Sequence, residues 1–478
     1  MKKLGLLALI PALVLAVASC KKSSNGTTNV AAAQIQVGQA ISDTTTGGPL
    51  KGTFGSGKTY NIKRDIVVNF GDTLLIQSGV TLKMSSGVNI IVHGKFVSLG
   101  TSSAPVSITT GATKTTGSSS PSSDPAYAGG WGGIYCDTSC NLLVLKWTHL
   151  DFGGAVLIPQ PFNGPTAGSS DYVVWFGCPN GDFIMEDSWV YGCPDDVIRF
   201  YGGRINMMRN TFEKFGGTGG DGFNSKSGTQ GNMAYNMFIG GATNGTKCSD
   251  DGNINPQNMI AMYNNTYVNC GFRNNGTFGA RAGCAEVEND SRALVYNNII
   301  VNCLTGYRIA GGPKGSKVYL ADTSAHSDGP ITQTKYGYNL MYGDDSTITD
   351  QFVPTSIAQA EATQPQSTDI PNMKAFLGLS YNIGDTYSGA SLVGQNNPEF
   401  KNYPLPNKNY VGQASIDAYD FHLAPGSPAI GKGYKGFSAI TTCTIGSIPV
   451  DPNFGSSGIT GPGSDLGCYQ TDGSGNQH

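Results

Sequence analysis

Short apolar runs alternate with polar residues along most of the chain, and they lack the spacing of amphipathic helices. Runs such as 59–62 and 73–76 follow one another from Leu50 onward, with turn pairs such as Gly71-Asp72 between them. Alternation over a few residues between Gly-containing turns is typical of β-strands. The pattern therefore predicts an all-β protein of many short strands.

One pattern repeats between Phe183 and Cys303, at spacings of 23, 26, 29 and 33 residues. The repeated positions are Asp187, Asn210, Asn236, Asn265 and Asn298. A period of about 20 to 50 residues indicates a solenoid or array, and two to three short strands per period make one coil of a parallel β-helix. Coils stack about 4.8 Å apart, so we expect the Asn side chains to form a hydrogen-bonded ladder, with long loops at the corners.

A second, acidic track accompanies the first. Its members are Asp195, Asp196, Asp221, Asp250 and Asp251. We expect them in a column down one corner, where carboxylates about 5 Å apart repel unless they bind a cation or keep protons. Ca²⁺ prefers such oxygen ligands and is the cofactor that this interpretation implies. The alternative is that the Asp-Gly and Asp-Asp pairs only form turns.

Composition narrows the class of protein. The chain has 67 Gly among 478 residues and only 13% charged residues, which fits a turn-rich β-protein. The net charge of −3 gives no electrostatic reason to expect nucleic acid as a partner. Residues 52–59 match the P-loop pattern, but a strand-like run follows them where phosphate binding requires a helix, so no nucleotide is expected.

The N-terminus has the features of an export signal. Lys2-Lys3 precedes an apolar run at 4–17 that is too short to span a bilayer, and residues 17–20 resemble a bacterial lipobox. We expect a signal peptide at 1–19, lipidation of Cys20 and a flexible tether at 20–48. The remaining expected parts are an N-terminal cap with the first coils at 49–110, the β-helix at 111–345, an irregular decoration at 346–415 and a C-terminal module at 416–478.

Ten cysteines remain after Cys20, an even number in an oxidising compartment. Cys270 and Cys303 follow their ladder Asn by the same five residues, so they occupy equivalent places on adjacent coils. The expected disulfides are Cys270–Cys303, Cys136–Cys140 and Cys443–Cys468, with Cys178–Cys193 and Cys248–Cys284 as weaker pairings.

Several segments carry a family resemblance. Residues 397–400, 420–430 and 465–469 resemble the C-terminal end of right-handed parallel β-helix proteins of the pectate-lyase-like superfamily. Residues 71–80 and 131–134 are similar to secreted β-helix proteins of Bacteroidota. The resemblance implies a right-handed parallel β-helix, but this superfamily holds lyases, hydrolases and adhesins, so it leaves function open.

The resemblance also implies a chemistry. Pectate-lyase-like enzymes use Ca²⁺ to neutralise a uronate carboxylate while a Lys or Arg base removes the neighbouring proton; the basic residues near the acidic track are Arg199, Lys226 and Arg281. The Asp195-Asp196 pair is similar to the paired carboxylates of polygalacturonase-type hydrolases. That hydrolase pattern also needs a Gly-His-Gly and an Arg-Ile-Lys element, and neither stands at the right distance in this sequence.

Aromatic residues suggest a binding role, because flat rings bind sugars. The candidate binding residues are Trp175, Trp189, Tyr191 and Tyr201. The leading expectation is a lipid-anchored outer-membrane protein, exposed at the cell surface, that binds a polysaccharide or another surface ligand. The alternatives are a Ca²⁺-dependent polysaccharide lyase acting on uronate-containing glycans and an adhesin or structural stalk.

Overall fold

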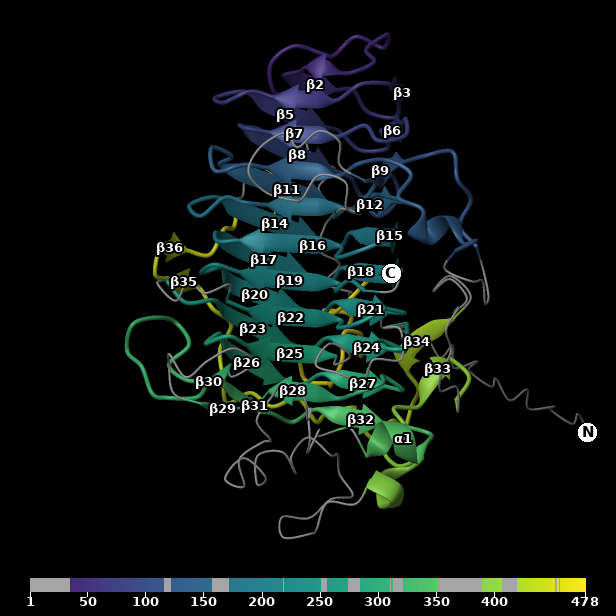
Figure 1. Ribbon diagram of the computed structural model, residues 1–478, viewed down its shortest axis with the longest axis vertical. Coiled ribbons are helices and arrows are strands. Elements are labelled where there is room, and N and C mark those ends of the chain that lie inside the picture. Colours follow the sequence, from purple (N-terminus) through teal and green to yellow (C-terminus); the bar gives the residue numbers. More distant parts are fainter. Residues whose placement is uncertain are drawn as a thin grey trace, which may run out of the picture. The chain divides into compact units, whose positions relative to one another are not determined.

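The protein is an all-β, right-handed parallel β-helix (Figure 1). The computed structural model describes residues 35–115, 122–156, 172–217, 219–250, 256–273, 284–309, 311–312, 321–350, 352, 389–405, 419–451, 454 and 456–478. The chain divides into two units, residues 1–35 and 36–478, and everything below concerns the second. The predicted signal peptide, Cys20 and most of the predicted tether and decoration lie outside the described residues.

Each coil contributes one strand to each of three parallel sheets of ten strands. Sheet 1 consists of β1 (Gly48–Pro49), β4 (Ile66–Val68), β7 (Ile90–Val92), β10 (Ile134–Cys136), β13 (Val174–Phe176), β16 (Ile198–Tyr201), β19 (Phe223–Lys226), β22 (Thr246–Ser249), β25 (Ala285–Glu288) and β28 (Tyr307–Ile309). Sheet 2 consists of β2 (Gly52–Phe54), β5 (Thr73–Ile76), β8 (Lys95–Leu99), β11 (Leu142–Lys146), β14 (Asp182–Glu186), β17 (Arg204–Met208), β20 (Gln230–Ala234), β23 (Met259–Tyr263), β26 (Arg292–Tyr296) and β31 (Lys335–Gly337). Sheet 3 consists of β3 (Thr59–Ile62), β6 (Thr81–Met84), β9 (Val106–Thr109), β12 (Thr148–Asp151), β15 (Trp189–Cys193), β18 (Thr211–Phe215), β21 (Met237–Ile239), β24 (Thr266–Val268), β27 (Ile299–Val301) and β32 (Leu340–Tyr342).

A few short elements lie outside the three sheets. They are η1 (Pro125–Tyr127), β29 (Gly311–Gly312), β30 (Ala321–Asp322), α1 (Ser346–Thr349), η2 (Gly389–Leu392), β33 (Phe400–Asn402), β34 (Asp420–Leu423), β35 (Thr442–Cys443) and β36 (Gly446–Ser447). Residues 52–59 form β2, a turn and the start of β3, so the P-loop pattern leads into a strand and not into a helix.

Apolar side chains fill the inside of the coils. Equivalent aromatic residues lie above one another, as the rings of Phe212, Phe238 and Tyr267 do, with centroid separations of 4.7 and 5.2 Å and nearly parallel planes. Such stacks follow from the register of parallel strands, because β18, β21 and β24 place these three residues at the same level.

The predicted Asn ladder is confirmed. In Asn210, Asn236, Asn265 and Asn298 the side-chain Nδ2 donates to the Oδ1 of the next member at 2.9 to 3.1 Å, and the ladder continues to Asn339. All four side chains are fully buried. The Oδ1 of each next member also accepts a hydrogen bond from the backbone N–H of the member before it. The amide side chains therefore provide a hydrogen-bond partner for one buried backbone N–H in each coil.

The first member of the ladder differs from the prediction. The backbone N–H of Ser188, and not that of Asp187, donates to Asn210 Oδ1 at 3.0 Å. Asp187 is instead level with Arg209 and accepts from its Nε at 2.6 Å. Both residues have positive φ, 48° and 60°, because the chain turns sharply between sheets 2 and 3 immediately before each ladder position.

The C-terminal segment covers sheet 2 and the adjoining corner. Ile440 exchanges two hydrogen bonds with the side chain of Asn232 on β20, at 2.7 and 2.8 Å. Further along, the N–H of Gly463 donates to Asn264 Oδ1 at 2.9 Å. On sheet 3, Tyr403 next to β33 donates to the Oδ1 of Asn269 at 2.9 Å.

The ten described cysteines are free thiols, and their positions revise the predicted pairings. Cys443 lies on β35, which contacts β20 in sheet 2, whereas the N–H of Cys468 donates to Thr266 at the start of β24 in sheet 3. The length of β23, about 3.3 Å per residue, separates the two places, so a disulfide between them would need a large backbone movement. The Cys443–Cys468 prediction is therefore wrong.

Six of the other eight described thiols form two groups of three. Cys136, Cys140 and Cys178 lie within hydrogen-bonding reach of one another. Cys303 is within such reach of both Cys270 and Cys284.

Both weaker pairings are also wrong. Cys193 donates to the carbonyl of Asp196, away from Cys178. Cys248 is level with Val287 and three residues out of register with Cys284.

Disulfide mapping checks this arrangement. In protein oxidised during export, we expect any disulfides to join members of the same thiol group, because only these approach closely enough. Mass spectrometry of a non-reduced digest should show no peptide linking Cys443 to Cys468. A major linkage between those two residues would contradict the placement of the C-terminal segment.

Candidate functional site

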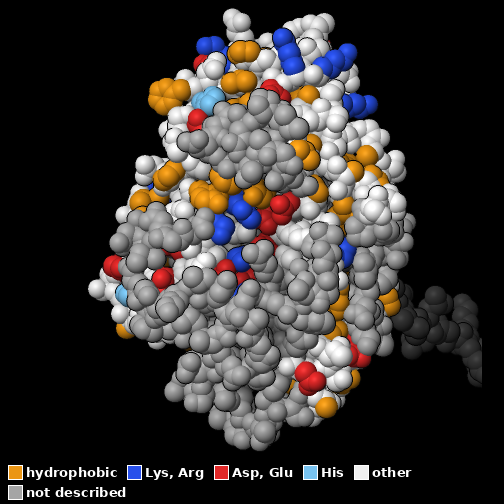
Figure 2. All heavy atoms as spheres, viewed as in Figure 1, with side chains coloured by type: hydrophobic (Ala, Val, Ile, Leu, Met, Phe, Trp, Pro, Cys, Tyr) orange, Lys and Arg blue, Asp and Glu red, His pale blue; other side chains and the backbone are white. Residues whose placement is uncertain are grey.

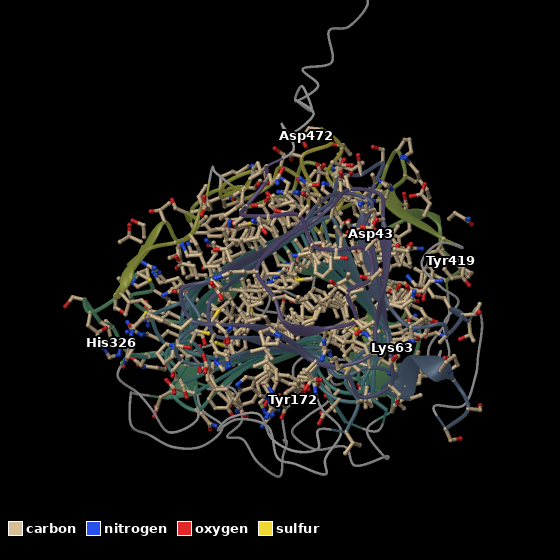
Figure 3. All side chains as sticks on the ribbon, turned by 90° about the horizontal axis from the view of Figure 1, so that it is seen from above. Asp43, Lys63, Tyr172, His326, Tyr419 and Asp472 are labelled. Carbon is tan, nitrogen blue, oxygen red and sulfur yellow. The ribbon has the colours of Figure 1, made fainter. Side chains whose placement is uncertain are left out.

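The outer face of sheet 1 is the candidate site. The hydrogen bonds that residues 419–478 make with the β-helix go to sheets 2 and 3 and their corners within the described part of the chain. In the view along the axis, Tyr172 of the sheet 1 side and Asp472 of the C-terminal segment lie on opposite sides of the coils (Figure 3). The C-terminal segment thus does not reach the outer face of sheet 1. Most outward side chains of the strands from β10 to β28 are nevertheless buried, and Arg199, Tyr201 and Lys226 are the partly exposed ones.

The strands of sheet 1 bring one outward row of side chains into register. In β16, Ile198 and Phe200 are buried in the core while Arg199 and Tyr201 point outward, as alternation in a strand requires. The outward row runs from coil to coil through Tyr135, Trp175, Arg199, Asn224, Lys247, Glu286 and Arg308. A second row holds Tyr201, Lys226, Ser249 and Glu288.

Aromatic rings stack at one end of these rows. Tyr172 and Trp175 have centroids 5.5 Å apart, and Trp175 and Tyr201 have centroids 4.6 Å apart, with planes inclined by 25° and 29°. The guanidinium of Arg199 lies 4.6 Å from the ring centroid of Tyr172. Figure 2 shows hydrophobic side chains next to Lys, Arg, Asp and Glu at the centre of this face. The structure therefore brings predicted binding residues Trp175 and Tyr201 together with predicted catalytic residues Arg199 and Lys226.

Part of the acidic track forms the predicted column, but with a packing role. Asp196 Oδ1 accepts the N–H of Asp221 at 2.7 Å, so these two residues lie on adjacent coils. Asn224 Nδ2 donates to both carboxylates, at 2.9 and 3.1 Å, and Arg199 Nε donates to Asp196 at 2.8 Å. Asn244 donates twice to Asp221 Oδ1, at 2.8 and 3.1 Å. All four oxygens thus accept from protein donors and hold the corner of successive coils together.

Asp250 does not continue that column. Phe223 is level with Thr246, so the position equivalent to Asp221 is Asn244, and Asp250 lies at the other end of β22. There its Oδ2 accepts the N–H of Asn258 at 3.2 Å. Asp251 and Arg281, which the sequence analysis also assigned to the site, lie outside the described residues.

Two carboxyl groups of the acidic track have pKa values well above the usual value for Asp. Burial, reinforced by the neighbouring Asp196, raises the pKa of Asp195 to about 7. Burial alone dominates at Asp250 and raises its pKa to about 7 as well. Both groups therefore change charge near neutral pH.

Four charged side chains occupy the other end of the rows. Lys247 Nζ lies 2.8 Å from Glu288 Oε1 and 3.4 Å from Glu286 Oε1, and Arg308 contacts both carboxylates. The side chain of Glu286 is fully buried and that of Glu288 is 4% exposed. We call Lys247, Glu286, Glu288 and Arg308 the charged tetrad.

The pKa values of Glu286 and Glu288 are shifted in opposite directions. Burial and the adjacent Glu288 raise the pKa of Glu286 to about 8, more than Lys247 and Arg308 lower it. Burial opposes the charge of Glu288, but hydrogen bonding from Glu286 and the nearby cations lower its pKa to about 2. At neutral pH the tetrad therefore holds one carboxylic acid and one carboxylate.

In the sequence Lys247, Glu286 and Glu288 lie near the acidic track, but no motif groups them with Arg308. The sequence feature that could have indicated the tetrad is the alternation Ala285-Glu286-Val287-Glu288. This alternation places both carboxyl groups on the outer face of one strand. Arg308 stands at the centre of the three-residue strand Tyr307–Ile309 and points outward for the same reason.

Trp189 and Tyr191, also predicted to bind ligand, belong to a different face. They lie on β15 in sheet 3, and the Nζ of Lys114 lies 4.6 and 4.9 Å from their ring centroids. Tyr191 is fully buried and packs edge-to-face on Phe152. These two residues therefore do not join the aromatic stack of sheet 1.

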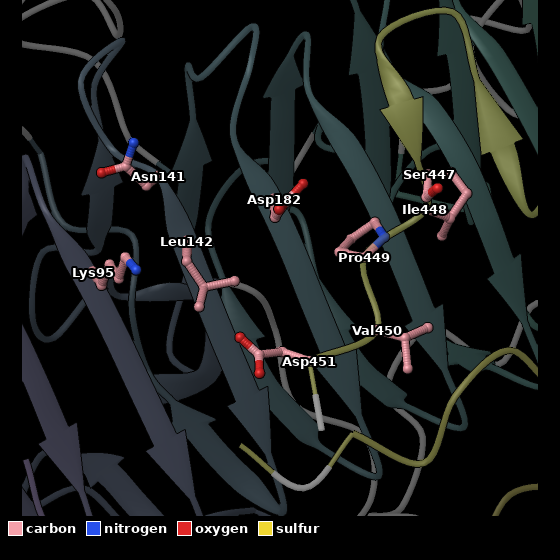
Figure 4. A pocket seen from close by; sticks show the side chains of 9 residues that line it. All are labelled: Lys95, Asn141, Leu142, Asp182, Ser447, Ile448, Pro449, Val450 and Asp451. Atoms are coloured by element: carbon pink, nitrogen blue, oxygen red, sulfur yellow. The ribbon is translucent and has the colours of Figure 1, made fainter. Parts of the chain in front are cut away.

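A polar cavity of about 480 Å³ lies on sheet 2 beside the C-terminal segment (Figure 4). Its walls are Lys95, Asn141, Leu142, Asp182, Ser447, Ile448, Pro449, Val450 and Asp451. Asp182 is paired with Arg204 at 2.6 Å. Because no aromatic ring lines this cavity, it offers no flat surface for a sugar.

Comparisons with known proteins give no assignment: no family model, no curated protein and no solved structure matches the chain. The described residues contain no group of three or more His, Cys, Asp or Glu side chains arranged to hold a metal ion. A search of the same residues for a helix of sufficient length and apolarity to cross a bilayer finds none.

Proposed function

We propose that the protein is a lipid-anchored, surface-exposed β-helix protein of the bacterial cell envelope that binds a glycan on the outer face of sheet 1. The observation that carries this proposal is the stack of Tyr172, Trp175 and Tyr201 beside Arg199. Tyr201 is the partly exposed ring of this stack, whereas Tyr172 and Trp175 are 9% and 6% exposed. Tyr201 can therefore offer an apolar face to a sugar ring, and the partly exposed Arg199 can bond to its hydroxyls. The lipid anchor rests on Cys20, and the pectate-lyase-like, Bacteroidota-type relationship rests on the sequence segments given above.

The parallel β-helix suits this role. Coils about 4.8 Å apart repeat the same outward positions along the axis, so a polymer can contact several coils at once. The aromatic and polar part of the row extends from Tyr135 on β10 to Arg308 on β28, and before Tyr135 the same row continues with apolar residues on β7 and β4. The partly exposed residues Arg199, Tyr201 and Lys226 lie on the adjacent strands β16 and β19, so a saccharide can contact two coils there.

Arg199 supports the lyase alternative less well than the binding proposal. Burial disfavours the charge of Arg199, but Asp196 and the two tyrosines raise its pKa overall, so it holds its proton. Ca²⁺ is not needed in the proposal, because the oxygens of Asp196 and Asp221 already accept protein hydrogen bonds. Lys226, level with Tyr201, stays the candidate base among the described residues.

Replacing Tyr201 tests the proposal. We expect Tyr201→Ala to weaken glycan binding about tenfold, because an aromatic contact contributes about 0.5 to 1.5 kcal/mol beyond its buried area. Titration calorimetry or affinity electrophoresis across neutral and acidic polysaccharides measures the change. Tyr201 is only partly buried, so the melting temperature should change little.

The matched control is Phe70→Ala. Phe70 is an aromatic side chain 74% exposed at the other end of the solenoid, and its removal should leave binding unchanged. Equal affinities for wild type and Tyr201→Ala would remove sheet 1 as the binding face. A lack of binding across the whole panel would favour the adhesin or stalk alternative.

A further inference from the structure

We propose that the N-terminal end of the β-helix is a docking surface for the anionic headgroups of the membrane to which the chain is anchored. This inference rests on the lipid anchor in the proposed function and not on glycan binding. It adds a partner, an anionic lipid surface, and an orientation in which the first coil faces the bilayer.

Charge is distributed unevenly along the chain. Residues 36–110, which include the first coils, have six Lys or Arg against three Asp, a net charge of +3. Residues 111–478 have twenty Lys or Arg against thirty Asp or Glu, a net charge of −10. The first coils therefore carry positive charge in a chain that is otherwise acidic, and such an asymmetry orients a molecule in an external field.

The cations of the first coil stand at its corners. Lys51 lies between β1 and β2, Lys58 between β2 and β3, and Lys63 and Arg64 between β3 and β4. All four residues are exposed. Figure 2 shows Lys and Arg side chains together at the end of the molecule where Figure 1 places β2. Positive charge is thus presented around the end of the solenoid.

These cations are available to an external anion. Lys63 and Arg64 form no ion pair with a described residue, unlike the other two corner cations, which pair with Asp72 and Asp43 at 3.1 and 2.7 Å. Exposed pairs of this kind contribute little to stability, so they compete weakly with a new partner. Near an anionic membrane surface, each Lys or Arg strengthens binding about fivefold.

An exposed aromatic side chain lies close to the corner cations. Phe70 is 74% exposed, the largest value among the described large hydrophobic residues. It follows β4 in the second coil, two residues before Asp72, which pairs with Lys51 of the first coil. Apolar side chains next to cations bury themselves at the boundary between headgroups and acyl chains. Phe70 is therefore a sign of a lipid surface that does not depend on charge.

The chain enters the β-helix at this same end. The backbone N–H of Val37 donates to Thr53 Oγ1 on β2 at 2.8 Å, and that hydroxyl donates back to Val37 O at 2.7 Å. Cys20 and Gln36 are 16 positions apart, and a chain of this length cannot span more than about 58 Å. A lipid on Cys20 keeps the cations close to the bilayer, where tethering makes even a weak surface attraction effective.

Docking by this end sets the height of the candidate glycan site. In sheet 1, five strand intervals lead from β1 to β16 and six lead to β19. At about 4.8 Å per coil, Arg199, Tyr201 and Lys226 lie roughly 24 to 29 Å along the axis from the first coil. The solenoid then stands with its axis away from the bilayer, and sheet 1 faces sideways beyond the headgroups.

Vesicle binding by the unlipidated mature chain tests the surface. The chain from residue 20 with Cys20→Ser is sedimented with vesicles of phosphatidylcholine alone, or of phosphatidylcholine and phosphatidylglycerol in equal parts. We expect binding to the anionic vesicles only, weakening as salt rises because ions screen the attraction. Lys63→Gln combined with Arg64→Gln should weaken that binding about thirtyfold, since each cation contributes about fivefold.

Lys432→Gln combined with Lys435→Gln is the matched control. It removes two exposed cations on either side of Tyr434, whose N–H and carbonyl bond to the side chain of Asn297 between β26 and β27. Binding and melting temperature should stay at the wild-type level, and the first double variant should keep the same melting temperature. Equal binding by the two double variants, or equal binding of the wild type to both kinds of vesicle, overturns the surface.

Measurements on the lipidated protein separate this inference from the proposed function. In anionic vesicles, hydrogen exchange in peptides spanning 48–70 should be slower than in zwitterionic vesicles, while 335–342 should exchange equally in both. The same exchange at 48–70 in both lipids overturns the orientation and leaves the anchor and glycan binding in place. Exported protein without a lipid on Cys20 overturns the anchor and the orientation together, whereas the affinity of Tyr201→Ala for glycan reports on sheet 1 alone.

Discussion

Replacing Asn265 by Ala should destabilise the protein by about 3 kcal/mol or more, because a buried polar group left without its partner costs about 1 to 3 kcal/mol. Asn265 Oδ1 accepts from both the backbone N–H and the Nδ2 of Asn236, at 3.0 and 3.1 Å. Its own Nδ2 donates to Met233 O and Asn298 Oδ1. An alanine leaves several of these groups unsatisfied at a fully buried place.

Chemical denaturation followed by circular dichroism measures the effect. Asn61→Ala is the matched control, since Asn61 is an exposed Asn on β3 of the same sheet system. Its replacement should change the free energy of unfolding very little. If the two variants were equally stable, the ladder would not be the interaction that holds the coils in register.

The second large effect should come from Lys214→Met, which we expect to cost about 3 to 5 kcal/mol. Lys214 Nζ lies 2.8 Å from Asp124 Oδ2, and the two side chains are 0% and 1% exposed. Methionine leaves Asp124 as an uncompensated buried charge. Asp124 also caps η1 by accepting the N–H of Ala126, so the loss should loosen η1 from sheet 3.

A double variant and a surface control show whether the loss of stability in Lys214→Met comes from the buried ion pair. Lys214→Met combined with Asp124→Asn removes both charges and should recover a large part of the loss. Lys51→Met removes a cation that is 73% exposed and paired with Asp72 at 3.1 Å, and it should have little effect because exposed ion pairs contribute little. Equal losses for Lys214→Met and Lys51→Met would mean that the pair at η1 is solvated.

The fold could be predicted because its main constraint is periodic in sequence. The Asn ladder needs the same residue type at the same place in each coil, and Asn210, Asn236, Asn265 and Asn298 record it directly. The first copy was misplaced by one residue, since Asp187 and Ser188 are both polar and only the register of β15 with β18 distinguishes them.

The acidic track was harder, because spacing alone does not say where extra residues enter a coil. Asp221 and Asp250 are 29 residues apart, the same as Asn236 and Asn265. The register, however, is 23 residues at Phe223 and Thr246 and becomes 29 only at Gln230 and Met259. The additional residues therefore enter between β22 and β23, so Asp250 falls beyond the strand and out of the column.

The binding face was predicted only in part. Trp175 and Tyr201 were predicted to bind because they are aromatic. No feature of the neighbouring sequence distinguishes them from Trp189 and Tyr191, which lie on sheet 3. The two pairs of aromatic residues differ in whether the C-terminal segment lies against their face of the β-helix. That contact joins residues more than 200 positions apart, as between Asn232 and Ile440, and no sequence period encodes it.

A crystal structure of the protein with a bound oligosaccharide tests the central claim most directly. The account predicts a sugar ring on Tyr201 at the aromatic stack, with the glycan lying along the outer face of sheet 1 past Lys226. Sugar bound in the cavity beside Asp182, or on sheet 3 at Trp189, with the face of sheet 1 empty, would contradict it.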